Sequence, residues 1–177
     1  WHLIRSIVVV FFISIIAFIF KNIVFDVILL GPKDPNFVTY RFLCQISNLI
    51  GLNDALCLTE SPFSLMNINM SGQFSTHITA SFFAGLILGF PYISWELWRF
   101  IRPALYNEET DIARGVVFTS STLFVLGVLF GYYVIAPLSI NFLGSYQVSS
   151  MVSNQISLSS FISTVTTVTF INGIIFQ

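Results

Sequence analysis

The chain has 177 residues, of which 55% are hydrophobic, 16% aromatic and only 8% charged. A soluble domain carries roughly 25% charged residues, because its surface must stay hydrated. With a mean hydropathy of +0.86, the composition excludes an ordinary soluble domain and indicates a protein immersed in a lipid bilayer. The formal net charge of −1 shows no basic excess, which argues against binding to nucleic acid.

Four segments are long and apolar enough to cross the membrane as helices. A span needs about 20 mostly apolar residues to cover roughly 30 Å of hydrocarbon. The segments cover about residues 3–30, 74–98, 113–137 and 156–176. The sequence therefore predicts an all-α fold, a polytopic transmembrane helical protein with a single membrane domain over residues 1–177.

Several residues mark where these helices end, bend or touch. Gly31-Pro32 should stop the first helix, and Pro91 should kink the second or free a carbonyl near Ile87. In the third, Gly127 and Gly131 stand four residues apart and would allow close contact with another helix.

The fourth span is rich in Ser, Thr and β-branched residues, which in water would suggest strands. In lipid, an open strand would leave backbone groups unpaired at several kcal/mol each. Hydroxyl groups can instead bond back to carbonyls of the preceding turn. A helix packed against other helices is therefore the expected structure.

The distribution of basic residues predicts the orientation. Near the first residue and the 99–112 loop lie Arg5, Arg99, Arg102 and Arg114, whereas the opposite side holds Lys21, Lys33 and Arg41. The positive-inside tendency then favours both ends of the chain, and the 99–112 loop, in the cytoplasm. Residues 31–73 and 138–155 would form periplasmic loops.

The first periplasmic loop should contain a short amphipathic helix within residues 38–51, VTYRFLCQISNLIG. Cys44 and Cys57, the two cysteines of the chain, both fall in this loop. In an oxidising compartment they could form a disulfide that stabilises the fold by about 3 kcal/mol; the alternative is two buried free thiols. A metal site is not expected, since four ligands are normally needed and no His lies near in sequence.

The segment from Trp95 to Arg114, WELWRFIRPALYNEETDIAR, concentrates charge in a chain otherwise nearly devoid of it. Glu96 lies close to the membrane boundary, and Glu108, Glu109 and Asp111 lie at the start of the third span. Acidic groups in the first turn of a helix are favoured by its dipole, by about 0.3–1 kcal/mol. Helix capping is therefore one explanation of this acidic cluster.

The same segment resembles a known family. The pattern W-x-F-x-x-P-A-L-Y-x-x-E is formed by Trp98, Phe100, Pro103, Ala104, Leu105, Tyr106 and Glu109. It is similar to the first cytoplasmic loop of TatC, the polytopic core of the twin-arginine (Sec-independent) protein translocase. The likeness continues through PYISWELWRF, YYVIAPLSINFL and FISTVTTVTFINGIIFQ, and so spans almost the whole chain.

The resemblance implies a six-helix protein with both termini in the cytoplasm, residing in the bacterial cytoplasmic (inner) membrane. Against that pattern the chain looks like a fragment that lacks the last two helices and a Glu-Leu-Arg motif just before Trp1. Glu96 stands where Gln is frequent, and Thr110 follows Glu109 where a basic residue is common. Both departures change the local charge.

The implied partners are signal peptides of folded cargo, with two adjacent arginines before an apolar segment. A carboxylate can accept a guanidinium bidentately, and Glu109 is the residue expected to do so. Phe100 and Trp98 would stack on arginine, or belong to the interfacial aromatic belt. Glu108 would strengthen the negative field, and Pro103 and Tyr106 complete the motif.

A second implied surface lies at the end of the fourth span, where Gln177 occupies a position usually Glu or Gln. It would dock the single-span TatA/TatB-type subunits, with Thr169 and Asn172 on the adjoining surface. The alternative for Gln177 is an ordinary amide at a helix end. Further TatC copies and the lipid bilayer are the other expected partners.

No enzymatic motif is found. Neither lysine follows a Gly-rich phosphate loop, and no Ser lies in a G-x-S-x-G motif, so we expect no cofactor and no catalytic residues. Transport would be driven by the proton-motive force, as the resemblance implies. The alternatives are a secondary transporter of a small solute, which would favour internal repeats and midplane charges, and a structural scaffold, which leaves the acidic aromatic loop unexplained.

Overall fold

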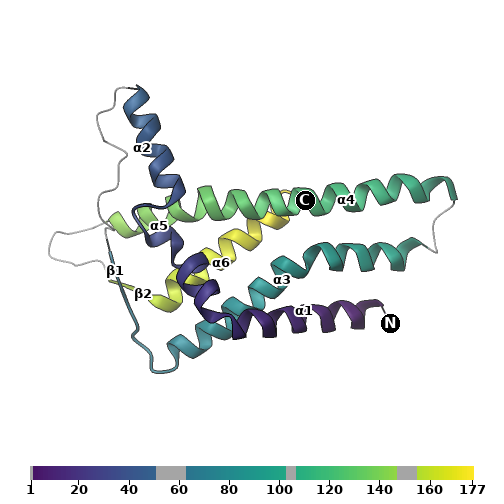
Figure 1. The fold of residues 1–177 in the computed structure, drawn as a ribbon, viewed down its shortest axis with the longest axis horizontal. Coiled ribbons are helices and arrows are strands. Elements are labelled where there is room, and N and C mark those ends of the chain that lie inside the picture. The colour runs from purple at the N-terminus through teal and green to yellow at the C-terminus, as the bar shows by residue number, and fades with distance from the viewer. Residues whose placement is uncertain (1, 51–62, 103–106, 147–154) are drawn as a thin grey trace.

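A computed structural model describes residues 2–50, 63–102, 107–146 and 155–177, and within these the side chains of 2–48, 63–102, 115–146 and 155–177 (Figure 1). Four helical segments are long and apolar enough to cross a membrane: His2–Ile19, Gly72–Ile101, Gly115–Ser145 and Leu158–Ile175. The expected all-α, polytopic membrane fold with four spans in this chain is confirmed.

The first span is a straight helix followed by a turn of the chain. Helix α1 covers His2–Ile19, the π-helix η1 covers Ile23–Leu29, and the 3-10 helix η2 covers Gly31–Lys33. The chain changes direction between α1 and η1 (Figure 1). The π-helix ends at Leu29, just before the Gly31-Pro32 pair predicted to stop the helix, and that pair instead forms a 3-10 turn with Lys33.

Helix α3, Gly72–Ile101, lies against α1 and makes the closest approach at two glycines. A Cβ atom on Gly85 would lie 3.0 Å from the carbonyl oxygen of Val10, and one on Gly89 would lie 3.0 Å from its Cγ2. Helix α3 bends along its length (Figure 1), and Pro91 lies inside it. A proline within a helix is an established cause of such bending.

The third span is longer than expected. Helix α4 covers Asn107–Phe130, the π-helix η4 covers Gly131–Ile135, and α5 covers Ala136–Ser145. The helical path therefore continues past Pro137, through residues expected to form a loop. Because this helical path is continuous, Pro137, the second residue of α5, leaves the Tyr133 carbonyl four residues earlier without its usual N–H donor. The Thr39 hydroxyl donates to that carbonyl instead.

Helix α6, Leu158–Ile175, confirms that the Ser- and Thr-rich span is helical. Ser157 caps it, because the Ser160 N–H donates to its hydroxyl at 3.3 Å. Within the helix, the Thr164 hydroxyl donates to the Ser160 carbonyl at 2.8 Å and the Thr166 hydroxyl to the Ile162 carbonyl at 2.8 Å. These bonds satisfy the Thr164 and Thr166 hydroxyl groups without requiring water, whereas the buried Thr169 hydroxyl has no partner among the described residues.

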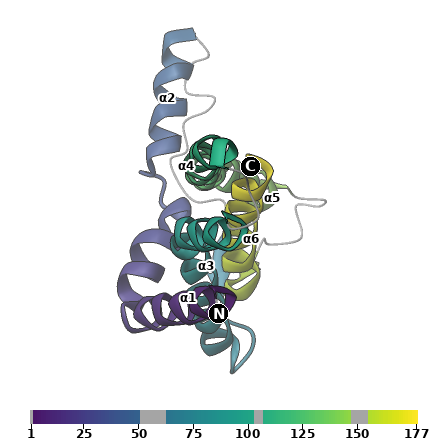
Figure 2. The same ribbon diagram turned by 90° about the vertical axis from the view of Figure 1, so that its right-hand side faces the viewer.

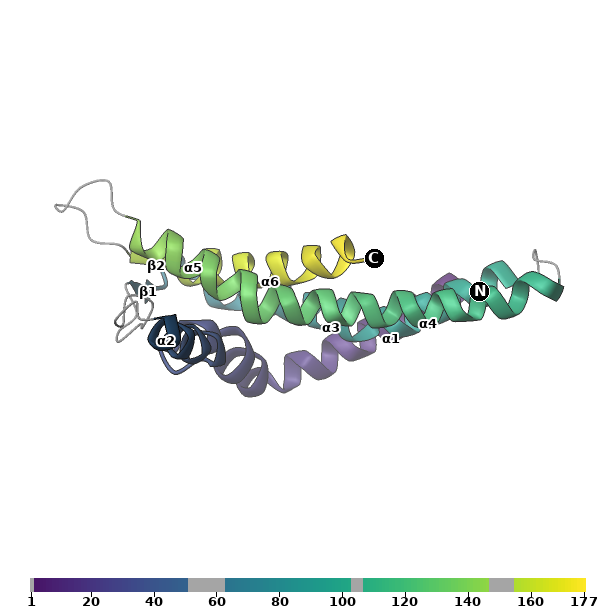
Figure 3. The ribbon, with the colours of Figure 1, turned by 90° about the horizontal axis from the view of Figure 1, so that it is seen from above.

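Helix α6 packs closely on α4 and η4. A Cβ on Gly127 would lie 2.6 Å from the Asn172 carbonyl oxygen, and one on Gly131 would lie 3.1 Å from the Thr169 Cα. The predicted close contact at Gly127 and Gly131 is therefore present. Figure 3 shows α6 and α1 on opposite sides of α3 and α4.

A short parallel strand pair, absent from the predictions, joins the segment just before α3 to the segment just before α6. Strand β1, Ser64–Met66, pairs with β2, Gln155–Ser157, in the register Leu65↔Ile156. Next to this pair lies a buried apolar cluster consisting of Leu29, Phe63, Ala80, Ile140, Phe161, Ile162 and Val165. The cluster joins η1, α3, α5 and α6 at one end of the molecule.

The predicted amphipathic helix is present as α2, Val38–Ile50, and it projects away from the bundle (Figure 2). Its first turn is anchored by the buried Tyr40, whose hydroxyl lies 3.0 Å from the carbonyl oxygens of both Pro32 and Pro137. Burial raises the pKa of the Tyr40 hydroxyl to about 12. The contact fixes α2 to η2 and α5.

We predict that Tyr40→Phe lowers the free energy of unfolding by about 1–2 kcal/mol at neutral pH, because two buried carbonyls lose a donor. The raised pKa stabilises the folded state below pH 10, and this contribution is lost as the pH rises from about 10 to 12. The gap between wild type and variant should therefore narrow above pH 10. Thermal unfolding in detergent at pH 7 and pH 11.5 measures both effects; equal stability at pH 7 would contradict the proposed anchor.

Candidate functional site

The segment singled out from the sequence lies where α3 ends and α4 begins. Helix α3 ends at Ile101, Arg102 caps it, and α4 begins at Asn107. The start of α1 reaches the same end of the molecule, which faces the viewer in Figure 2. We call this the α3–α4 end; the opposite end, with α2 and the strand pair, is the α2 end.

The two aromatic residues of the motif point in different directions. Trp98 is buried, whereas the Phe100 side chain is 59% exposed. Residues two positions apart on a helix project to nearly opposite sides. Only Phe100 is therefore presented to a ligand outside the helix bundle, and Trp98 packs inside it.

The acidic residues of the motif lie on the first turn of α4. Glu108 and Glu109 are its second and third residues, where the positive end of the helix dipole favours a negative charge. The positions of their side chains lie outside the described residues, as do Pro103 and Tyr106. The exposed ring of Phe100 lies one residue before the end of α3, on the other side of this short connection.

A carboxylate that the sequence analysis did not choose, Glu96, is the most deeply buried charged group described. Its side chain is 1% exposed, and its Oε1 lies 2.7 Å from Nδ1 of His2 at the start of α1. The bond joins residues 94 positions apart in sequence and ties the start of α1 to the last turns of α3.

The second oxygen of Glu96 is less well satisfied. Its Oε2 lies 3.6 Å from the guanidinium of Arg99, one turn further along α3, and has no hydrogen-bond partner among the described residues. The Arg99 side chain is 51% exposed. Glu96 is thus a buried carboxyl group between two basic side chains from different helices, and it lies next to the motif.

One feature of the sequence could have identified Glu96 as a candidate functional residue. An acidic residue close to a membrane boundary, in a chain with 8% charged residues, generally has a partner or a function. Its partner His2 was beyond sequence reasoning, because nothing local relates residue 2 to residue 96.

At the end of α6, the residues expected to dock partner helices differ in exposure. Gln177 is exposed, and its Nε2 donates a hydrogen bond to the hydroxyl of Ser120 on α4. Asn172 is half-buried and donates to the Val168 carbonyl at 2.8 Å. Thr169 is buried against η4 of the same chain. Of the three, Gln177 is therefore the most accessible to another protein.

Of the two cysteines predicted to form a disulfide, only Cys44 lies within the described residues. Cys44, on α2, is disulfide-bonded. Cys57 lies outside the described residues, so the pairing of the two cysteines stays a prediction.

An apolar cavity of about 620 Å³ lies between α1, η1, α3, the end of α4, η4 and α6. Its walls are aliphatic and aromatic side chains such as Ile13, Phe83, Ile87 and Leu129, and Thr166 and Thr169 add hydroxyl groups from α6. Such a surface suits an apolar chain or helix face. The described part of the chain contains no group of three or more His, Cys, Asp or Glu residues that could hold a metal ion.

Comparison with known sequences identifies relatives along the whole chain. The family model of the Sec-independent protein translocase protein (TatC) matches residues 1–177. The TatC of Blattabacterium sp. subsp. Periplaneta americana (strain BPLAN) is 37% identical over 163 residues, which cover 92% of this chain and 61% of that protein. The TatC of Escherichia coli (strain K12) is 31% identical over 129 residues, 66% of this chain and 49% of that protein.

A solved structure shows the same architecture. A crystal structure of the twin arginine translocase receptor TatC matches with a TM-score of 0.58 and 26% sequence identity, over 99% of this chain and 70% of that one. The chain spans 61% of the length of the Blattabacterium relative and 49% of the Escherichia coli one. With a family model that covers every residue and a matching fold, the chain belongs to the TatC family of Sec-independent protein translocase proteins.

Proposed function

We propose that this protein is the signal-recognising subunit of a twin-arginine translocase, which exports folded proteins across the bacterial cytoplasmic membrane. The observation that carries the proposal is the family match over residues 1–177. The α3–α4 end supports it, since acidic residues and an exposed aromatic ring meet there at the end of two membrane helices. A secondary transporter of small solutes is not favoured, because the matched relatives are named as protein translocase components.

In this proposal the α3–α4 end faces the cytoplasm, and so do both ends of the chain. The basic residues counted on that side support this orientation. Signal peptides approach from the cytoplasm, so the acidic residues on the first turn of α4 meet them at the inner membrane surface. The α2 end then faces the periplasm, an oxidising compartment that suits a disulfide at Cys44.

Glu109 would accept one guanidinium of the arginine pair bidentately, a geometry that an ammonium cannot reproduce. The exposed Phe100 offers a ring face for stacking on the same or the neighbouring arginine. Glu108, beside Glu109 on α4, adds negative potential without direct contact. Recognition in this scheme combines charge, planarity and an aromatic surface.

The apolar segment that follows the arginines would occupy the apolar cavity. Two of its lining residues, Ile87 and Leu88, lie on α3 about 13 Å along the helix axis from Glu96, at about 1.5 Å per residue. An apolar segment that starts at Ile101, the last residue of α3, would reach Leu88 in the cavity after about four turns. Burial of apolar side chains there would add binding energy that does not depend on the arginines.

The energy for transport is proposed to come from the proton-motive force. The sequence holds no Gly-rich phosphate loop before either lysine, so it offers no site for nucleotide hydrolysis. Single-span TatA/TatB-type subunits and further TatC copies would complete the translocation path, with Gln177 as the contact of this chain.

We predict that Glu109→Gln weakens binding of a twin-arginine signal peptide by about 10- to 150-fold, because a charge-assisted bond of about 1.5–3 kcal/mol is lost. Binding of a labelled peptide to the full-length protein in detergent measures this. A Lys-Lys peptide should bind the wild type weakly, and Glu108→Gln is the matched control on the same helix turn. Unchanged affinity in Glu109→Gln would remove Glu109 from the site.

Glu96 is proposed as a positioning residue that holds the start of α1 beside the end of α3. We predict that Glu96→Ala lowers the free energy of unfolding by about 1–3 kcal/mol, since His2 loses its buried partner. Glu96→Gln should restore most of that stability, because an amide also bonds to imidazole. Thermal unfolding measures this, and signal-peptide affinity should fall and recover in parallel. Wild-type affinity in a folded Glu96→Ala variant would contradict the positioning role.

Gln177 is proposed to dock a partner helix. We predict that Gln177→Leu in the full-length protein reduces crosslinking to TatA/TatB-type subunits several-fold, because an amide that can bond across the interface is removed. Ser120→Ala is the matched control, since it removes the same bond within the chain and leaves the Gln177 amide in place. Equal losses in both variants would assign the effect to the contact between α4 and α6.

A further inference from the structure

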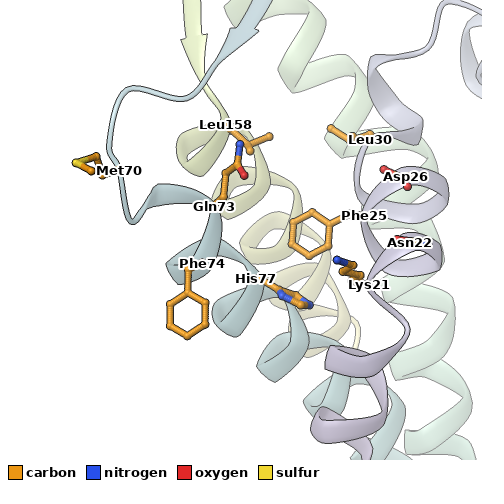
Figure 4. A pocket seen from close by; sticks show the side chains of 10 residues that line it. All are labelled: Lys21, Asn22, Phe25, Asp26, Leu30, Met70, Gln73, Phe74, His77 and Leu158. Carbon is orange, nitrogen blue, oxygen red and sulfur yellow. The ribbon is translucent and has the colours of Figure 1, made fainter.

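A polar cavity lies at the α2 end, away from the residues used above (Figure 4). It has a volume of about 560 Å³ and is bounded by the α1–η1 junction, the start of α3 and the start of α6. The lining residues are Lys21, Asn22, Phe25, Asp26, Leu30, Met70, Gln73, Phe74, His77 and Leu158. His77 and Glu96 lie 19 residues apart on α3, or about 28 Å at 1.5 Å per residue, so the cavity is separate from the α3–α4 end.

Two basic side chains converge in this cavity. Lys21 and His77 extend toward each other from facing helices, below the ring of Phe25 (Figure 4). The His77 ring stacks on Phe18 with centroids 3.9 Å apart and meets the edge of Phe25 at 5.2 Å. The imidazole is therefore held by aromatic contacts, and its Nε2 has no hydrogen-bond partner among the described residues.

The charges of the cavity are not used elsewhere in the described structure. Both ion pairs found there involve Glu96, so neither Lys21 nor Asp26 forms one within the described residues. Asp26 lies on η1 and lines the same cavity, with amide groups from Asn22 and Gln73. Two basic side chains with a carboxyl group nearby suit a zwitterionic ligand. The anionic group of the ligand would meet Lys21 and His77, and its cationic group would meet Asp26.

The depth of the cavity in the membrane indicates the source of such a ligand. Helix α1 has 18 residues and is therefore about 27 Å long, so Lys21 lies near the boundary of the hydrocarbon core. The first turn of α3, with the positive end of its helix dipole, lines the cavity at the same level. Phe74, also in the cavity wall, is 63% exposed and apolar. Phosphate groups and the upper parts of acyl chains meet at this depth.

We propose that this Lys21–His77 cavity binds a phosphate group, namely that of a phospholipid headgroup. Lys21 and His77 donate to the phosphate oxygens, and Asp26 accepts from an amine-bearing headgroup such as phosphatidylethanolamine. The glycerol and acyl chains leave along Phe74 toward the lipid. A bound lipid would connect η1 to α3 at the point where the first span changes direction.

The test is lipid binding to the full-length protein in detergent, measured by native mass spectrometry during titration with phosphatidylethanolamine. Lys21→Met removes a charge from an exposed side chain, and Lys33→Met is the matched control, since Lys33 is outside the cavity. We expect about tenfold weaker lipid binding in Lys21→Met, as for loss of one charge-assisted bond, and no change in Lys33→Met. His77→Gln should also weaken binding.

Two further ligands distinguish the source of the phosphate. Diacylglycerol, which lacks the phosphate, should bind weakly to wild type and variants alike. Inorganic phosphate should compete with the lipid in wild type only at much higher concentration, because it lacks the acyl chains. The proposal is overturned if Lys21→Met binds lipid like wild type, if Lys33→Met is equally weakened, or if diacylglycerol binds as well as phosphatidylethanolamine. Binding of inorganic phosphate with no binding of phospholipid would overturn the lipid as the ligand.

Thermal unfolding without added lipid shows whether a variant has lost stability rather than a lipid contact. This control is needed because His77→Gln removes a ring that packs between Phe18 and Phe25. Lys21→Met leaves these aromatic contacts in place. Weaker lipid binding by Lys21→Met at an unchanged unfolding temperature supports the site. Normal lipid binding by both folded variants refutes it.

Discussion

Close approach of helix backbones is the constraint on which the rest of this structure depends. Between helices in lipid there is little hydrophobic driving force, so association depends on van der Waals packing and on interhelical hydrogen bonds. Glycines provide that packing at both main contacts: Gly85 and Gly89 of α3 against α1, and Gly127 and Gly131 against α6. A side chain at Gly85, Gly127 or Gly131 would overlap the neighbouring helix, and one at Gly89 would press on the Val10 side chain.

The glycine contacts lie in the middle of the α1–α3 pair, and its histidines and charged side chains lie toward the two ends. At one end of the α1–α3 pair Glu96 bonds to His2, and at the other His77 faces Lys21. A charge at the centre of the pair would need a partner in lipid, whereas charges at the ends can meet water, headgroups or a ligand. Because α1 and α3 pack closely along their length, the contacts at both ends depend on the same helix pairing.

The membrane fold was predictable because its rules are local. Length and hydropathy give the four spans, and the amphipathic pattern over residues 38–51 gives α2. Two features were missed for a common reason: the helical path continues past Pro137, and β1 pairs with β2 across a long stretch of sequence. A π-helix before the proline and a partner strand some 90 residues away leave no periodic signal in the segment itself.

In the candidate site, too, some features were visible in the sequence and others depend on how the helices pack. The motif from Trp98 to Glu109 was visible in the sequence, which suggested that Trp98 and Phe100 contact the same ligand. On a helix these two side chains project to nearly opposite sides, so only the exposed Phe100 can do so. Glu96 was visible as a charge but not as half of a pair, because His2 reaches it only through the packing of α1 on α3. Sequence motifs identify which residues carry the chemistry. The glycine contacts decide which of them meet, and so a change at Gly85 or Gly89 should disturb the Glu96–His2 bond without touching either residue.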